Sequence, residues 1–385
     1  MEYRPLRIGQ YEFPVPIVQG GMGVKISGPS LVGPVAEEGA GGTMTAIGLG
    51  KRTHRMSFED FNRTSCEALR HEIESLRMLT SKPFAVNIMG ALSNPDDLIR
   101  TAVNPGNDST GVKIAGANII VFGAGIPKTL PAIVDDPTVA LVPIVSSARL
   151  AEFIIKLWLE RYGRLPDAVV IEGPLAGGHL GFSLEQLLPE NIGKFSLENI
   201  LRETLQIINR YEQEYGRKIP IIVAGGVYTG EDIAYYLSLG ASAAQLGTRF
   251  VATFECPVSE RFKLEYVQAK PEDIRIIRTP VGMPGRVLNN KFLKELAKLR
   301  ENQRKGGETR KLSCPYHCLR SCEQEKALFC IAEQLDQSFD GEIDNGLIFC
   351  GANVYRIDRI MSVHELITEL MDGVKASALT LPSTL

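Results

Sequence analysis

Residues 168–182 read AVVIEGPLAGGHLGF, and residues 219–226 read IPIIVAGG. Both stretches are apolar on successive residues and then break into glycine, which is typical of parallel strands covered on both faces. Similar short runs alternate with longer segments of helical period between residues 14 and 250. Eight such βα units in one domain are what a (β/α)8 barrel requires, and a doubly wound sheet is the alternative.

The sequence therefore predicts an α/β fold, a TIM barrel, in which eight strands alternate with helices. Helical segments such as residues 148–162 and 197–215 supply crossovers between the strands. The predicted strands are residues 16–19, 42–47, 84–89, 118–123, 140–146, 168–172, 220–224 and 243–247.

After the last predicted strand the segments become shorter and prolines separate them, which indicates a change in organisation. We therefore expect three parts. They are a barrel over residues 1–250, a smaller substrate lobe and basic linker over residues 251–311, and a cysteine-bearing segment over residues 312–385 that packs back on the barrel. Residues 291–311 carry eight Lys or Arg against three Glu, a local net charge of +5. Such a run is either a solvated helix and linker or a docking surface for an acidic protein partner.

Composition narrows the class of partner. The chain of 385 residues is 44% hydrophobic and 23% charged, enough to bury a sizeable core. Its formal net charge of −3 gives no long-range attraction for polyanions, so we expect no nucleic-acid partner. The first residues lack an apolar signal region, and no stretch reaches eighteen uninterrupted apolar residues, so we expect a cytoplasmic protein without membrane contact. A homodimer is compatible with the sequence.

Glycines follow four of the predicted strands, at residues 20–23, 173–178, 225–226 and 247. Glycine lets backbone N–H groups approach a ligand closely, and the ends of the last two strands form the usual phosphate site of a barrel. This pattern predicts a phosphorylated cofactor, with glycines that serve only tight turns as the alternative. The candidate cofactor-binding residues here are Gly20, Gly21, Met22, Gly177, Gly178, Gly225, Gly226, Gly247 and Thr248.

Three side-chain amides also end predicted strands. Asn87 closes the third strand, at a level where it could bond the edge of a flavin ring, although it could instead be a turn residue. Gln19 and Gln245 end the first and last strands and support the same argument more weakly.

His179 is the candidate catalytic residue. Glycines surround it on a loop after the sixth strand, where a core histidine would have apolar neighbours. With an unperturbed pKa near 6.5, it could act as a general acid or base at neutral pH. A structural or phosphate-contacting role is the alternative.

These motifs carry a resemblance. PIVQGGMG, VNIMG, EGPLAGGHLGF, IIVAGGV and AAQLGTRF together resemble the nitronate monooxygenase superfamily, formerly called 2-nitropropane dioxygenases, which includes enoyl-acyl-carrier-protein reductase II. The resemblance implies a barrel over residues 1–250 that binds FMN, with His179 as the base beside the flavin. Gly178, Gly225, Gly226, Gly247 and Thr248 would hold the phosphate, and Gly21, Met22, Asn87 and Gln245 would line the isoalloxazine ring.

Five of the seven cysteines fall in the last 72 residues, which in a reducing compartment indicates metal or redox chemistry before disulfides. Cys314, Cys318, Cys322 and Cys330 have the spacing C-x3-C-x3-C-x7-C. In one straight helix the first and third thiols would lie ~12 Å apart, too far for one cluster, but Pro315 makes a turn that gathers four sulfurs more plausible. We expect a [4Fe–4S] cluster, with zinc or unligated thiols as alternatives and His317 as a minor alternative ligand.

The cysteine block and the following GLIFCGANVYRIDRIMSVHELITEL resemble the iron–sulfur (FabX-type) subgroup of the superfamily, although the last cysteine spacing is shorter than expected for it. The resemblance implies an acyl-carrier-protein dehydrogenase/isomerase of unsaturated fatty acid synthesis, with acyl carrier protein as the acidic partner of residues 291–311. The alternatives are a nitronate monooxygenase that uses O2, an NAD(P)H-dependent enoyl-acyl-carrier-protein reductase, and a non-catalytic flavin-binding or redox-sensing module. The sequence assigns no role to Cys66, Cys256 or Cys350.

Overall fold

The computed structural model describes residues 3–50, 56–306, 314, 318–320, 322 and 327–380. It confirms the TIM barrel, because eight parallel strands close on themselves in chain order. Each of the eight predicted strands forms, with ends shifted by at most one or two residues. The barrel strands are β3 (Ile17–Gln19), β4 (Gly41–Thr45), β5 (Ala85–Met89), β6 (Ile119–Gly123), β7 (Ala140–Val145), β8 (Val169–Glu172), β10 (Ile221–Ala224) and β11 (Ala243–Leu246).

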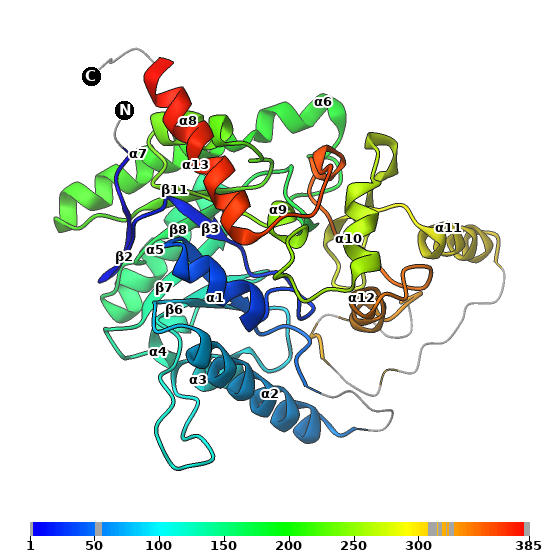
Figure 1. Ribbon diagram of the computed structural model, residues 1–385, viewed down its shortest axis with the longest axis horizontal. Coiled ribbons are helices and arrows are strands. Elements are labelled where there is room, and N and C mark those ends of the chain that lie inside the picture. Colours follow the sequence, from blue (N-terminus) through cyan, green and yellow to red (C-terminus); the bar gives the residue numbers. More distant parts are fainter. Residues whose placement is uncertain are drawn as a thin grey trace.

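Helices surround this barrel (Figure 1). The longest helix between each two consecutive barrel strands is, in chain order, α1 (Pro29–Glu37), α2 (Phe58–Leu79), α3 (Pro95–Val103), α4 (Leu130–Ile133), α5 (Ala148–Tyr162), α7 (Leu197–Tyr215) and α8 (Gly230–Ser238). The predicted bounds of α5 and α7 agree with the structure because both helices carry strong caps. Ser147 and Ser196 accept N-terminal hydrogen bonds, and Gly163 and Gly216 end the helices in the left-handed conformation.

An N-terminal hairpin covers one end of the barrel. Its strands β1 (Leu6–Ile8) and β2 (Tyr11–Phe13) pair antiparallel. Leu6, Ile8 and Phe13 are buried in one cluster with inward-facing side chains of the barrel strands, such as Val18 and Val170. This apolar plug fills the barrel interior on the hairpin side, so a ligand site can form only at the other end.

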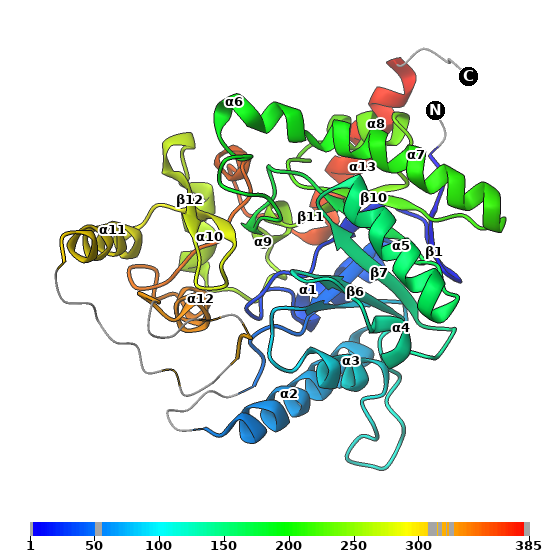
Figure 2. The same ribbon diagram turned by 180° about the vertical axis from the view of Figure 1, so that it is seen from behind.

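The remaining elements gather mainly at one side of the barrel, where α10, α11, α12 and β12 lie together (Figures 1 and 2). A three-stranded antiparallel sheet, in the order β12–β13–β9, joins this side to the loop that follows β8. β9 and β13 pair across the predicted boundary at residue 250, so the predicted barrel part and the part that follows it share a sheet. The division of the chain into three parts stays a prediction. These elements are β9 (Gly178–His179), α6 (Pro189–Ile192), η1 (Gly193–Phe195), α9 (Thr248–Val251), α10 (Glu260–Val267), η2 (Pro271–Asp273), β12 (Ile274–Arg278), β13 (Pro284–Leu288), α11 (Lys291–Arg304), α12 (Ile331–Asp340), η3 (Val354–Arg356) and α13 (Val363–Thr380).

The last helix, α13, packs closely on α8 of the barrel, and Figure 1 shows the two side by side. Glycines permit this approach, since a Cβ at Gly230 would collide with the backbone of Leu370 and one at Gly373 would meet Gly230 Cα at 2.9 Å. Within the described ranges, none of the helices combines the length and the apolar character needed to span a membrane.

Candidate active site

A cavity of about 310 Å³ lies at the carboxyl ends of the barrel strands, within the size range of small-molecule sites. The sequence-predicted catalytic and cofactor-binding residues all lie on its wall, although their roles stay predictions. They are Gly20, Gly21, Met22, Asn87, Gly177, Gly178, His179, Gly225, Gly226, Gln245, Gly247 and Thr248. Gln19 does not line the cavity: it is fully buried, and its amide donates to Ser27 Oγ at 2.7 Å.

Two consecutive glycines form the floor of the predicted phosphate site. Gly225 and Gly226 have φ angles of +92° and +96°, a region that side-chain-bearing residues rarely adopt. A Cβ at Gly225 would meet the Gly173 carbonyl oxygen at 2.9 Å, and one at Gly226 would meet Leu175 Cβ at 3.0 Å. Only glycine therefore fits this turn, and its backbone stays open to a ligand.

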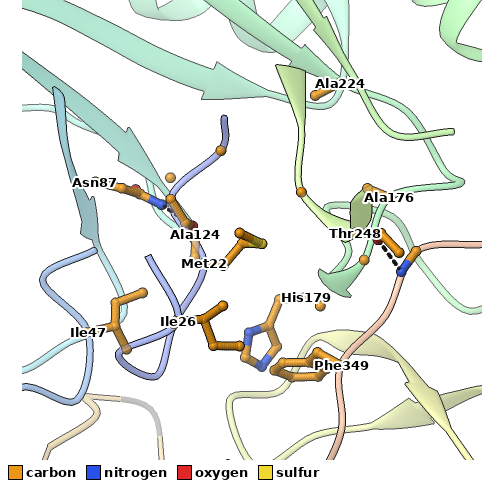
Figure 3. A pocket seen from close by; sticks show the side chains of 18 of the residues that line it. Met22, Ile26, Ile47, Asn87, Ala124, Ala176, His179, Ala224, Thr248 and Phe349 are labelled. Carbon is orange, nitrogen blue, oxygen red and sulfur yellow. Dashed lines mark hydrogen bonds between the residues drawn. The ribbon is translucent and has the colours of Figure 1, made fainter. Parts of the chain in front are cut away.

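A segment from residues 312–385, which the sequence predicts to pack back on the barrel, closes this site; its contact with the glycine cradle was not predicted. The Gly351 N–H donates to Thr248 Oγ1 at 2.9 Å, and Asn353 Nδ2 donates to the Gly226 carbonyl at 2.6 Å. A Cβ at Gly177 would meet the Cys350 carbonyl carbon at 2.7 Å. Figure 3 shows the Thr248 hydrogen bond at the edge of the cavity. Residues 350–353 thus form a cap over the glycine cradle.

Asn87 lies on another part of the wall, in the middle of β5 and not at its end as the sequence suggested. Its Nδ2 donates to the Gly21 carbonyl at 2.9 Å, whereas its buried Oδ1 has no hydrogen-bond partner in the described part of the protein. A buried acceptor without a partner is unfavourable unless a ligand supplies a donor. The glycine cradle and this open acceptor fit a phosphorylated cofactor whose ring carries an N–H group, as FMN does.

His179 is partly buried in β9 and faces the cavity (Figure 3). Its Nε2 lies 3.1 Å from Thr279 Oγ1, and its ring packs edge-on against Phe349 with centroids 5.1 Å apart. Burial lowers the pKa of His179 to about 4. The expectation of an ordinary pKa near 6.5 was therefore wrong, because the glycine neighbours in sequence hid the apolar contacts that the fold brings. The ring is neutral at pH 7.

Glu172 ends β8 and also lines the cavity. Burial raises its pKa to about 7, and the nearby Arg286 opposes this shift. Arg286 is itself buried, and its guanidinium donates to the Ala176 carbonyl and, at 2.8 Å, to the Pro174 carbonyl. Arg286 therefore holds the loop between β8 and His179. Glu172 could have been found from the sequence, because it stands directly before the glycine motif. Arg286 has no such feature in the sequence around it.

Apolar side chains form much of the remaining wall, and they come from elements far apart in the sequence. They include Ile26, Ile47, Phe61, Met89, Leu92, Val281, Leu319, Ile331, Leu335 and Phe349. A cavity that is part glycine cradle and part apolar wall can hold a polar cofactor beside an apolar substrate group.

The four predicted cluster cysteines lie in or beside this region, and Cys318 is on the cavity wall. Cys318 and its neighbours attach to the loop after β5: the Ser93 N–H donates to the Cys318 carbonyl at 3.1 Å, and Leu92 pairs with Leu319 in a β-bridge. Burial raises the pKa values of Cys322 and Cys330, with smaller contributions from Cys314 and, for Cys322, from Cys330.

Three of the four thiols are thus close enough to interact electrostatically. In the described ranges no group of three or more His, Cys, Asp or Glu side chains is arranged to hold a metal ion. Pro315 and His317 lie outside the described residues. Four thiols are the donor set of an iron–sulfur cluster or of structural zinc, so the donor chemistry fits a cluster, whereas the described positions of these thiols do not form one metal site.

The barrel and its cavity define a TIM-barrel protein whose glycine cradle fits a phosphorylated cofactor. The chain belongs to the nitronate monooxygenase family, whose sequence model matches residues 5–373. Membership implies FMN as the cofactor, and it confirms the resemblance at the level of the family.

Among curated relatives, (3aS,4S,5R,7aS)-5-hydroxy-7a-methyl-1-oxo-octahydro-1H-indene-4-carboxyl-CoA dehydrogenase of Rhodococcus jostii is 28% identical over 281 residues, which are 73% of this chain and 64% of that protein. The present chain therefore spans less than two thirds of that relative. A protein of Staphylococcus aureus, named as a probable nitronate monooxygenase, is 26% identical over 311 residues, 73% of this chain and 77% of its own.

Among solved structures, FabK from Thermotoga maritima matches with a TM-score of 0.66 and 25% identity, over 95% of this chain and 94% of that chain. Nitroalkane oxidase from Streptomyces ansochromogenes has a TM-score of 0.65 at 22% identity, over 96% and 98% of the two chains, a likeness of fold alone.

Proposed function

We propose that the protein is an FMN-dependent oxidoreductase that dehydrogenates or isomerises acyl thioesters carried on acyl carrier protein. The observation that carries this proposal is an imidazole that faces a cavity with a glycine cradle and an apolar wall. The cradle suits FMN, and the apolar wall suits an acyl chain better than a small nitronate anion. The name of the Rhodococcus relative, a carboxyl-CoA dehydrogenase, supports a thioester substrate.

His179 would remove the proton from the carbon α to the thioester carbonyl. Burial keeps the ring in its free-base form at neutral pH, but it also makes the ring a weaker base. The enolate must therefore be stabilised, and backbone N–H groups at the glycine-lined strand ends can donate to its oxygen. FMN, when bound, would accept the hydride from the β carbon. For isomerisation, His179 would take a proton from C4 and return it to C2, which leaves the redox state unchanged.

Substrate turnover tests this proposal. A saturated medium-chain acyl thioester on acyl carrier protein, mixed anaerobically with the flavin-loaded protein, should bleach the visible flavin absorbance and yield an enoyl product. Propionate 3-nitronate should be a poor substrate under air. Fast oxidation of the nitronate without reaction of the thioester would favour a nitronate monooxygenase. Bleaching by NAD(P)H with reduction of an enoyl thioester would favour a reductase.

The cysteines are the second part of the proposal. Cys314, Cys318, Cys322 and Cys330 would ligate one [4Fe–4S] cluster beside the cavity, with zinc as the competing metal. The thiol donor set, the interaction among three of the thiols and the place of Cys318 on the cavity wall support it. A visible spectrum of anaerobically purified protein distinguishes the metals, since a cluster adds a broad absorbance beneath the flavin peaks and zinc adds none.

Helix α11 is the proposed docking site for the acidic acyl carrier protein. Lys291, Lys294, Lys298 and Arg304 are exposed on it, while residues 307–311 of the basic segment lie outside the described residues. Charge complementarity would steer an acidic partner to this helix. The double variant Lys294→Glu/Lys298→Glu should raise KM for an acyl group on the carrier protein but not for the same acyl group on free pantetheine. Equal effects on both substrates would argue against docking there.

A further inference from the structure

The residue that holds His179 lies outside the barrel. β9, which contains His179, pairs antiparallel with β13, with His179 opposite Gly285. β13 in turn pairs with β12, and Thr279 follows the last residue of β12. The hairpin therefore delivers Thr279 beside His179, one hundred residues away in the sequence, with Oγ1 3.1 Å from Nε2.

The Thr279 hydroxyl has a second neighbour. Thr279 Oγ1 donates to the Met283 carbonyl at 2.9 Å, and the Thr279 N–H donates to the same oxygen at 3.0 Å. A hydroxyl has one hydrogen, whereas a carbonyl oxygen can accept two hydrogen bonds. With that hydrogen directed to Met283, only lone pairs of Oγ1 face the imidazole. Nε2 must then carry the ring hydrogen and donate it to Thr279.

The other tautomer, with the hydrogen on Nδ1, leaves the Nδ1–H group without a hydrogen-bond acceptor. If the hydroxyl turned to donate to an unprotonated Nε2, the ring hydrogen would sit on Nδ1. Nδ1–H would then need an acceptor, and the ring is flanked by Phe349 in a partly apolar cavity. A buried donor without a partner is unfavourable. The Nε2–H tautomer instead satisfies the ring hydrogen, the hydroxyl and the carbonyl together.

Packing fixes the threonine in this position. Thr279 is 4% exposed, and a Cβ on Gly285 of β13 would lie 2.9 Å from its methyl carbon and 3.0 Å from the Phe349 ring. The methyl group and the ring therefore rest against a residue without a side chain. A β-branched residue has few side-chain rotamers, so this contact holds the hydroxyl in line with Nε2.

We propose that Thr279 is a positioning residue that holds His179 in the Nε2–H tautomer, so that Nδ1 is the atom that takes the substrate proton. The second half of this inference rests on the proposed function of His179 as the base; the tautomer itself does not. A neutral hydroxyl orients the ring here, where many catalytic histidines use a carboxylate. The hydroxyl thus fixes the orientation of the ring without placing a negative charge beside it, which would favour the protonated ring.

Nitrogen NMR of the flavin-loaded protein tests the tautomer. The protein is labelled with 15N-histidine, and the His179 signals are identified by their loss in His179→Gln. The wild type should show a protonated Nε2 and an unprotonated Nδ1 at neutral pH, and Thr279→Ser should show the same pattern. Thr279→Val should lose the preference. A protonated Nδ1 in the wild type, or an unchanged pattern in Thr279→Val, would overturn the proposal.

A matched control separates this effect from the loss of a buried hydroxyl. Thr253 is fully buried, donates to the Phe250 carbonyl at 2.8 Å and is not on the cavity wall, so Thr253→Val should leave the His179 signals unchanged. Flavin content and thermal unfolding check that each variant folds. With an acyl thioester, Thr279→Val should lower kcat about tenfold with little change in KM. This loss is a fraction of what a positioned base contributes. Thr279→Ser should keep most of the wild-type kcat. If the tautomer is as stated but no thioester reacts, the proposed function fails while the role of Thr279 stands.

Discussion

The backbone N–H of Gly351 donates a hydrogen bond to Thr248 Oγ1 across 2.9 Å, although 103 residues separate the two in sequence. Accepting this bond leaves the hydroxyl hydrogen of Thr248 available for an anionic ligand. Two distant parts of the chain thus form the predicted phosphate site: the ends of strands β10 and β11, and residues 350–353.

Gly226→Val should weaken FMN binding tenfold or more. A non-glycine residue in such a backbone conformation costs about 1–3 kcal/mol, and the new Cβ would also press on Leu175. The turn would relax and take its N–H groups away from the phosphate. Flavin content after purification is the measurement. Gly193→Val is the control, because no atom lies within 4 Å of a Cβ there, and it should keep its flavin. Full flavin in Gly226→Val would rule out this placement of the phosphate.

His179→Gln should keep FMN but slow substrate deprotonation by roughly 10² to 10⁴-fold, the usual contribution of a positioned acid or base. Gly178 precedes His179 in β9, but the imidazole itself contacts Phe349 and Thr279, so its replacement leaves the backbone N–H groups of the glycine cradle in place. Single-turnover flavin reduction and exchange of the substrate α-hydrogen with solvent measure this step. Activity within a few-fold of the wild type would remove His179 from the mechanism.

Buried His179 should make the flavin-free protein less stable in acid. Its folded pKa of about 4 lies below the unfolded value of 6.5, so the unfolded chain binds the extra proton between these pH values. The free energy of unfolding should therefore fall by roughly 3 kcal/mol from this group as the pH drops from 6.5 to 4. Denaturant titrations at a series of pH values, compared with His179→Gln, isolate the effect. Parallel pH profiles for the two proteins would contradict it.

Glu172 should act in the opposite direction. Its folded pKa of about 7 lies above the ordinary value of 4.5, so the folded protein keeps a proton that the unfolded chain releases between these pH values. This contribution weakens stability by roughly 3 kcal/mol as the pH rises from 4.5 to 7. Glu172→Gln has the same shape and no titration, so the decline from this group should vanish in denaturant titrations. A decline that persists unchanged would show that Glu172 ionises normally in the fold.

Replacement of Cys314, Cys318, Cys322 or Cys330 by Ser should lose iron and sulfide together while the barrel keeps its flavin. The reason is that the glycines predicted to hold FMN come from the barrel strand ends, whereas the thiols lie outside it. About four irons per chain in anaerobically purified protein would support the cluster. Cys66→Ser is the control, since that cysteine lies in α2 and should not affect iron content. One zinc per chain without sulfide would instead indicate a structural metal site.

The barrel was predictable because its signals are local. Runs such as residues 219–224 are apolar without alternation and end in glycine, and the helices between them carry serine and glycine caps, so each element could be recognised within a short window. The strand ends then placed the predicted site residues on one cavity wall, since every parallel strand of a barrel ends on the same side.

The rest of the site could not be predicted in this way because it depends on contacts between distant residues. Thr279 reaches His179 through pairing of β13 with β9, and Phe349 reaches it through a bridge with Val287. Thr279 stands in TPVGMPG and Phe349 in GLIFCGAN, but nothing in either stretch indicates that it lies beside His179. The same contacts explain the lowered pKa of His179, because its apolar neighbour comes from a part of the chain 170 residues away.

The pairing of β9 with β13 also determines how much of the chain must be synthesised before the cavity wall is complete. All eight barrel strands have been translated by residue 246, but the hairpin that holds His179 ends only at Leu288, and the cap over the glycine cradle follows at residues 350–353. A nascent chain can therefore close its barrel about a hundred residues before the cavity wall is complete. During that interval residues 350–353 cannot yet cover the cradle, so the contacts with Thr248 and Gly226 form only after that part of the chain has been synthesised.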